Sequence, residues 1–248
     1  MKSQFRDIFI ETATFGFKEE TGSWEIDLGV ANERSVGLLN SYVINQVKIF
    51  LLAFHKLCKP VEICYDTITI DANGKVQQVR EGQVKLIEEE NPARLLQQLK
   101  LSLDNPEESF FTTIFMDCDL CVFVTQLEDK LNEDTSNPVV IPRAAKFYFG
   151  YVMEPKEDDE EALLPSDSSV SFETSVDIWV ERTLDRLSLH WQDNHLCAAK
   201  NQPLLEEVLR KWEIQVGKPI VEWNSRYYRD QIFKYGFRGN GQWALDKE

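Results

Sequence analysis

The sequence predicts an α+β protein in which mostly antiparallel strands, built as hairpins, pack against three or four helices. Two patterns predict this class: alternating apolar residues between short polar turns, and longer segments with apolar residues at steps of three and four. The 248 residues are 43% hydrophobic and 28% charged, which is typical of a folded globular protein. We expect a single domain over residues 1–248, with a division into 1–153 and 170–248 as the alternative.

The chain should begin with a hairpin, followed by a long core helix. Alternating runs over residues 5–17 and 23–28 flank the polar segment 18–22, which we expect to be the turn. Asn32 or Ser35 should then cap a helix with one continuous apolar stripe. The stripe consists of Leu39, Val43, Val47, Phe50, Phe54 and Leu57.

A strand, a hairpin and a second helix come next. Residues 61–70 have strand character, and the Asn-Gly sequence within 71–74 favours a tight hairpin turn, because both residues tolerate positive φ angles. A second polar turn is expected at 81–82. The next helix should start at Asn91 and Pro92, where a capping residue precedes a proline suited to the first turn.

Residues 110–125 contain the strongest core-strand pattern in the chain. Every second residue from 114 to 124 is apolar, and the intervening positions include Asp117 and Asp119. In an extended strand these two carboxylates project from one face, about 6 to 7 Å apart, whereas Cys118 and Cys121 point to opposite faces. The two cysteines therefore do not form a ready-made metal-binding turn.

An acidic stretch separates the two halves of the chain. After a strand over 145–153, residues 154–169 begin with six acids in eight residues, and we expect a solvated, flexible loop there. Residues 170–180 and 184–191 should form strands, followed by a helix capped by Asn201.

The chain should close with a strand over 219–223 and a last helix over 225–235. The strand pair and helix that end at Gly217 parallel the earlier unit that ends with the helix after Asn91. A partial internal duplication is therefore a further hypothesis.

Charge, cysteine content and missing motifs limit the functional classes. A net charge of −15 disfavours broad binding to nucleic acid or to an anionic membrane, because both depend on Lys and Arg. Five irregularly spaced cysteines favour reduced thiols, and the absence of a signal peptide or long apolar run also predicts a cytoplasmic protein. No Walker loop, dinucleotide glycine motif, nucleophile elbow or His-Glu-x-x-His sequence is present.

The leading functional hypothesis is a non-catalytic interaction protein with a basic protein partner, such as an adaptor, an inhibitor or an immunity-like protein. The expected partner-binding residues are Glu157, Asp158, Asp159, Glu160 and Glu161. A second candidate segment is the basic, aromatic tail, in which Arg226, Arg229 and Arg238 could bind an anion. Docking of this tail on the acidic domain of its own chain is the favoured interpretation.

The alternative hypothesis is a metal-dependent enzyme that transfers nucleotidyl or phosphoryl groups. Asp117 and Asp119 would hold Mg²⁺ or Mn²⁺ together with Glu222, and His190 would assist. A hydrophobic strand segment with Asp-x-Asp, followed much later by Ser188-Leu-His190, resembles the catalytic pattern of archaeo-eukaryotic primase-polymerases over six or seven residues. The simpler interpretation places both aspartates on the wet face of a half-buried strand.

A zinc site is the least favoured hypothesis. Its ligands would come from Cys118, Cys121, His190, His195 and Cys197. Core thiols and surface histidines are the simpler interpretation, because both residues of the Cys-x-x-Cys lie among apolar side chains. We therefore expect no cofactor under the leading hypothesis.

Overall fold

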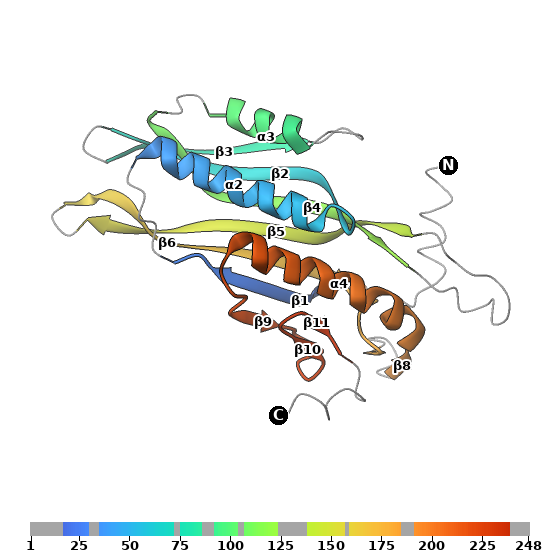
Figure 1. Ribbon diagram of the computed structural model, residues 1–248. Coiled ribbons are helices and arrows are strands. Elements are labelled where there is room, and N and C mark those ends of the chain that lie inside the picture. Colours follow the sequence, from blue (N-terminus) through green and yellow to red (C-terminus); the bar gives the residue numbers. More distant parts are fainter. Residues whose placement is uncertain are drawn as a thin grey trace.

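The protein is a mixed α+β fold built on one large antiparallel sheet, as the sequence predicts (Figure 1). The computed structural model describes residues 17–29, 35–71, 75–85, 92–103, 107–123, 138–156, 159–184 and 191–238. Within these residues the helices are α2 (Val36–Phe54), α3 (Pro92–Leu101) and α4 (His195–Val216). The seven strands of the sheet follow the order β3-β2-β4-β5-β6-β1-β9.

The strands of this sheet are β1 (Phe17–Asp27), β2 (Cys58–Ile70), β3 (Val76–Lys85), β4 (Ser109–Val122), β5 (Val139–Lys156), β6 (Asp159–Val176) and β9 (Glu222–Asn224). Two short pairs lie outside it: β7 (Arg182–Leu184) with β8 (Trp191–Asp193), and β10 (Ile232–Phe233) with β11 (Gly236–Phe237).

The sheet joins strands from both halves of the chain. Strand β1 pairs with β6 on one side and with β9 on the other, and both partners come from the second half. Strands β3 and β6 are separated by three strands in the order, yet Lys75 forms a bridge with Ala162. The sheet therefore twists and curls enough to bring these two strands together at one end.

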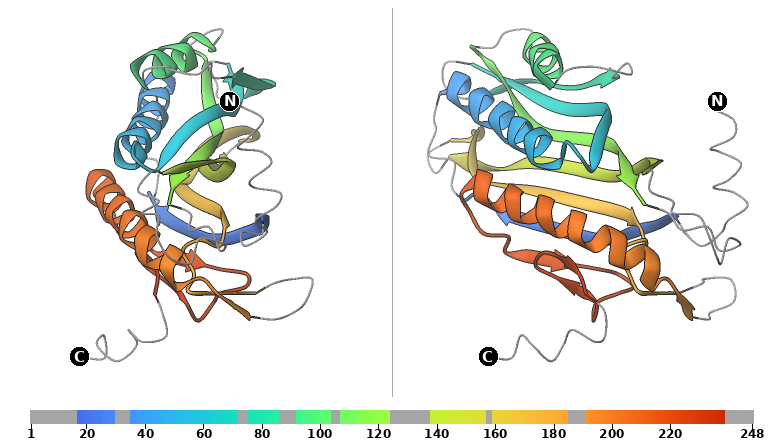
Figure 2. Two further views of the ribbon diagram at one scale, coloured as in Figure 1. Left: turned by 90° about the vertical axis from the view of Figure 1, so that its right-hand side faces the viewer. Right: turned by 45° about the vertical axis from the view of Figure 1, so that its right-hand side comes forward.

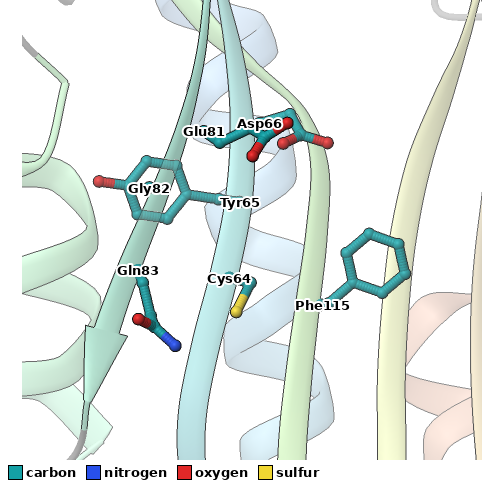
Figure 3. Close-up of a pocket in the computed structure, with 7 residues that line it drawn as sticks. All are labelled: Cys64, Tyr65, Asp66, Glu81, Gly82, Gln83 and Phe115. Carbon is teal, nitrogen blue, oxygen red and sulfur yellow. The ribbon is translucent and has the colours of Figure 1, made fainter.

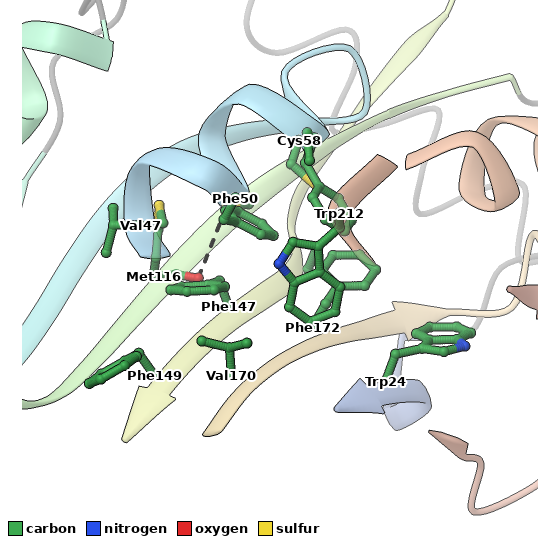
Figure 4. Packing of buried hydrophobic residues seen from close by; sticks show 14 of the residues in the cluster. Trp24, Val47, Phe50, Cys58, Met116, Phe147, Phe149, Val170, Phe172 and Trp212 are labelled. Atoms are coloured by element: carbon green, nitrogen blue, oxygen red, sulfur yellow. Dashed lines mark hydrogen bonds between the residues drawn. The ribbon is translucent and has the colours of Figure 1, made fainter. Parts of the chain in front are cut away.

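Helices α2 and α4 lie side by side on one face of the sheet, with α3 next to α2 (Figure 2). Between helices and sheet lies an aromatic core (Figure 4). The Phe54 ring of α2 lies 4.5 Å from the Phe172 ring of β6 and 5.8 Å from the Trp212 ring of α4. These three buried side chains fix both helices against the sheet, because large rings dominate core energetics. No described helix covers the opposite face, called the open face below.

The predictions for α2, α3 and β4 are confirmed. Ser35 caps α2, where its hydroxyl accepts a hydrogen bond from the Leu38 N–H at 3.4 Å. In β4 the alternate residues Ile114, Met116, Cys118, Leu120 and Val122 are all fully buried. Local signals of capping and alternation thus identified these elements.

Two predicted turns are wrong, because residues 18–22 lie inside β1 and residues 81–82 lie inside β3. The pairing of β1 with β6 shifts register between Phe17 and Gly22, and this irregularity accommodates the polar segment without a turn. Gly82 lies opposite Tyr65, and a Cβ atom at residue 82 would overlap the Tyr65 ring. Glycine is needed there for close packing between strands.

The predicted acidic loop 154–169 is also wrong over most of its length. Strand β5 continues to Lys156 and β6 begins at Asp159, so these residues form the end of a long hairpin. Both faces of such a two-stranded end can meet water, so an acidic composition is compatible with paired strands there. Residues 157 and 158 lie outside the described residues.

The end of the chain differs from the prediction in two ways. Helix α4 starts at His195, so Asn201 is an internal residue and not a cap. The predicted helix over 225–235 is wrong, because this segment forms turns and strands β10 and β11. Its apolar residues Tyr228, Ile232 and Phe237 are buried, although the segment that contains them is not helical.

The internal duplication is not confirmed. Helix α3 follows a hairpin, β2 and β3, of the main sheet, whereas α4 follows the separate pair β7 and β8. The strand pairs that precede the two helices thus differ in their place in the fold.

Helix α2 is the one described helix long and apolar enough to cross a membrane. Half of its most apolar window is buried inside the protein, and core helices of soluble proteins share this composition. Its length and composition are therefore weak evidence for a membrane span.

Candidate functional site

The open face of the sheet presents three parallel rows of side chains, each of which crosses from strand to strand. The central row runs Gln83, Cys64, Phe115, Tyr148, Ser171, Glu25 and Glu222. The row on one side of it consists of Lys85, Glu62, Asp117, Lys146, Glu173, Ser23 and Asn224. The row on the other side consists of Glu81, Asp66, Thr113, Gly150, Ser169 and Asp27. Residues paired across antiparallel strands project to the same side, so these rows form one surface.

The charges on this surface are strongly biased toward acid. The three rows contain eight carboxylates and two lysines, Lys85 and Lys146, and Arg143 reaches over them from β5. The three helices show the opposite bias, with six basic and three acidic residues in their sequences. The negative charge of the described residues is thus concentrated on the side of the sheet that lacks helices.

An aromatic pair, the exposed Phe115 and the half-buried Tyr148, lies at the centre of the open face. Phe115 of β4 is 49% exposed, and its ring lies 4.8 Å from the ring of Tyr148 on β5. The pKa of the Tyr148 hydroxyl is raised by burial and then by the nearby carboxylates of Asp66 and Glu25. An apolar centre with an acidic surround is a common arrangement for a protein-binding surface.

Beside Phe115 the open face is hollowed over strands β2, β3 and β4 (Figure 3). The hollow has a volume of about 450 Å³ and is lined by Cys64, Tyr65, Asp66, Glu81, Gly82, Gln83 and Phe115. Strand alternation directs Cys64 and Asp66 to the open face and Tyr65 to the other, where its ring contacts that of the buried Phe111. Burial, followed by the charges of Glu62 and Asp117, raises the pKa of the Cys64 thiol.

Asp117 and Asp119 share the open face, and both are bound by Arg143. The Arg143 guanidinium lies 2.9 Å from a carboxylate oxygen of Asp117 and 2.9 Å from one of Glu62, and its backbone N–H donates to Asp119 at 2.8 Å. Arg143 has a positive φ of 49° in an irregular stretch of β5, where the register with β4 shifts. The aspartate pair thus forms part of an ion-pair cluster that fixes this bulge.

The residues proposed to complete a metal site lie elsewhere. Glu222 is on β9, four strand spacings from β4, which corresponds to roughly 19 Å, so it cannot share one ion with Asp117. His190 lies outside the described residues. Among the residues that the structure describes, no group of three or more His, Cys, Asp or Glu side chains could hold a metal ion.

The proposed zinc ligands are also separated. Cys118 is buried on the helix-facing side of β4, and Cys121 is half-buried. Cys197 is buried in α4, where its thiol donates to the Phe123 carbonyl at 3.7 Å, and His195 lies at the start of the same helix. Burial, followed by the charges of Asp117 and Asp119, raises the pKa of the Cys118 thiol far above its usual range, so this thiol stays protonated.

No family model, curated protein or solved structure matches this chain. The resemblance to primase-polymerases therefore rests on its few motif residues alone.

The basic tail docks on its own chain through Glu213 of α4. Glu213 accepts hydrogen bonds from the Lys234 ammonium at 2.6 Å and from the Ile220 N–H at 2.9 Å, and the Tyr235 hydroxyl donates to its second oxygen. The Arg210 guanidinium lies 3.9 Å above the Tyr235 ring. One positive charge of the tail, that of Lys234, is therefore paired with a carboxylate of its own chain.

The three arginines proposed as anion ligands do not converge on Glu213. Arg226 and Arg229 are exposed, and the guanidinium groups of Arg226 and Arg238 lie over the Tyr227 and Phe233 rings, respectively. Intramolecular aromatic contacts therefore hold two of the three.

Replacing Glu213 with glutamine should lower the free energy of unfolding by about 1 to 3 kcal/mol at pH 7, because charge-assisted hydrogen bonds are lost. Burial alone would raise the pKa of Glu213, but the hydrogen bonds from Lys234, Tyr235 and Ile220 lower it. A lowered pKa stabilises the fold above the ordinary glutamate pKa, and this contribution is lost as the pH falls through the folded pKa. Urea titrations should therefore show a difference between the two proteins that is constant above about pH 5 and shrinks at lower pH. A difference that grows with acidity would contradict this role.

Sequence reasoning missed Arg143 and the hollow. Pro142 inside a strand pattern could have indicated the bulge next to Arg143, because proline in sheets concentrates at edges and bulges. The hollow had no local signal, since Asp66, Glu81 and Phe115 come from three strands.

Proposed function

We propose that the protein is a non-catalytic interaction protein whose open face binds a basic partner protein. The observation that carries the proposal is the segregation of charge: the three rows of the open face contain eight carboxylates and two lysines, whereas the helices have an excess of basic residues. An adaptor, an inhibitor or an immunity-like protein of the cytoplasm would use such a surface.

Electrostatics favour the open face as the site of first contact. A surface of one sign attracts a partner of the opposite sign and orients it before contact, which raises the association rate. The exposed ring of Phe115 then supplies apolar area at the centre of that surface. The acidic residues 157–161 are proposed as a second contact for the same partner.

The test compares two variants of equal charge. The face variant carries Glu25→Lys, Glu81→Lys and Glu222→Lys on the open face, and the control carries Glu107→Lys, Glu206→Lys and Glu207→Lys elsewhere. Tagged wild type and both variants are used for affinity purification from the native host, and co-purified proteins are quantified by mass spectrometry. We expect a basic protein in stoichiometric amount with wild type and control, and at least a tenfold loss with the face variant.

Two results would count against the proposal. One is a set of partners that the face variant leaves unchanged. The other is salt-dependent self-association of wild type in light scattering, since the basic helices of one copy could then occupy the acidic face of another.

The competing hypothesis is metal-dependent nucleotidyl or phosphoryl transfer at Asp117 and Asp119. It has less support, because the Arg143 guanidinium and backbone N–H already bind Asp117 and Asp119, respectively, and Glu222 lies four strand spacings away. The double variant Asp117→Asn, Asp119→Asn separates the two hypotheses: retained biological activity excludes the enzyme. The partial internal duplication remains a proposal: the two strand-pair and helix units would share an origin, although their strand pairs lie in different sheets.

A further inference from the structure

We infer that the hollow beside Phe115 binds an arginine side chain of the partner protein. This inference rests on the proposed function and adds to it the group that is recognised and the residues that recognise it. It concerns one part of the open face, so it can fail while the proposed function stands.

The lining of the hollow includes two acidic residues at directly opposed positions of neighbouring strands. Asp66 of β2 and Glu81 of β3 form a cross-strand pair, and Figure 3 shows their carboxylates close together. Like charges at directly opposite positions destabilise a sheet, and a bound cation would relieve this repulsion. The Thr113 hydroxyl donates a hydrogen bond to Asp66 and fixes one carboxylate before any ligand arrives.

The remaining wall of the hollow suits the rest of an arginine side chain. Phe115, 49% exposed, offers an aromatic ring to the guanidinium plane or to the apolar stem. A planar guanidinium can bond a carboxylate through two N–H groups while it stacks on a ring, whereas the compact lysine ammonium cannot do both as well. The combination of two carboxylates and one ring therefore favours arginine over lysine.

The same sheet contains a matched control. Glu25 of β1 and Glu222 of β9 are also a directly opposed pair of carboxylates on the open face. This second pair lies at the far side of the sheet, away from Phe115 and outside the lining of the hollow. A cation attracted by negative charge alone should depend equally on both pairs, whereas an arginine held in the hollow should depend on Asp66 and Glu81.

The test measures binding of fluorescein-labelled octa-arginine and octa-lysine by fluorescence anisotropy at 150 mM NaCl. The proteins are wild type, Asp66→Asn with Glu81→Gln, Glu25→Gln with Glu222→Gln, and Phe115→Leu. Each double variant removes two charges, and Phe115→Leu removes the ring but keeps apolar bulk. Circular dichroism and urea midpoints test whether each variant is folded. If the Asp66→Asn, Glu81→Gln variant is unfolded, the single variant Glu81→Gln replaces it.

We expect the Asp66→Asn, Glu81→Gln variant to weaken octa-arginine binding about tenfold or more. The Glu25→Gln, Glu222→Gln variant should weaken it no more than about threefold. Phe115→Leu should weaken octa-arginine by roughly three- to fivefold and octa-lysine less, because the stacked guanidinium is lost. Equal losses from both double variants, or tighter binding of octa-lysine, would overturn the inference and leave the acidic-face proposal standing. Absence of peptide binding by wild type would also overturn it, whereas the proposed function itself is tested by the partners of the face variant and by self-association of wild type.

Discussion

Replacing Trp24 with alanine should lower the free energy of unfolding by about 3 to 5 kcal/mol, the range for deleting a large ring from a packed core. Trp24 is fully buried on β1. Its ring lies 6.0 Å from that of Phe172 and 5.7 Å from that of Phe237, and its Nε1–H donates to the Phe233 carbonyl at 2.9 Å. One side chain thus joins the sheet to the C-terminal segment, and its loss leaves a cavity between them.

Urea denaturation followed by tryptophan fluorescence and circular dichroism measures this loss. Limited trypsin digestion should also show faster cleavage after Lys234 and Arg238, because Trp24 no longer holds their segment. Trp24→Phe is the matched control: it keeps a ring but loses the hydrogen bond to Phe233, so about 1 to 2 kcal/mol should be lost. An alanine variant as stable as the phenylalanine variant would show that the ring does not anchor this segment.

Asn201→Leu should lower the free energy of unfolding by about 2 to 3 kcal/mol, because three hydrogen bonds between the side-chain amide and backbone groups are lost. Asn201 is fully buried in α4. Its side-chain oxygen accepts from the Phe123 N–H at 2.8 Å, and its amide donates to the Phe123 carbonyl at 2.6 Å and to the Cys197 carbonyl at 2.9 Å. Leucine has similar bulk but none of these groups, so Phe123, directly after β4, keeps only the thiol hydrogen bond from Cys197 of α4.

The control for this prediction is Lys200→Leu, which introduces the same side chain at the adjacent, exposed position of α4. It should change stability by less than about 0.5 kcal/mol. Thermal or urea unfolding of both variants provides the comparison, and hydrogen exchange should show faster exchange of the Phe123 amide only in Asn201→Leu. Equal stability of the two variants would show that water replaces the asparagine without cost.

The elements that the sequence predicted are those specified by neighbouring residues. Ser35 caps α2 through the N–H three residues later, and the alternation in β4 follows from its own pleat. The errors have a common cause, which is that one residue type serves several roles. Gly82 permits close packing of Tyr65 and does not form a turn, and Asn201 bonds the backbone of Phe123 after β4 and does not cap its own helix.

The candidate site was predictable only in part, for a physical reason. Strand alternation places Asp117 and Asp119 on one face, and the structure has them there. Their partner Arg143 lies on β5, and the Asp66–Glu81 pair depends on the register of β2 with β3. Register between strands is a long-range property, so neither arrangement could be read from local spacing.

The pairing of β1 with β6 and β9 has a consequence for the nascent chain. Ser23 of β1 bonds Asn224 of β9 across 201 residues, so β1, the first described strand of the main sheet, cannot complete its pairing until β9, the last described strand of that sheet, is synthesised. Ribosomes add roughly 5 to 20 residues per second, and β1 therefore spends on the order of ten seconds or more without its neighbours. During this time Trp24 and Ile26 have no sheet to cover them, and we expect the emerging chain to be a client of ribosome-associated chaperones.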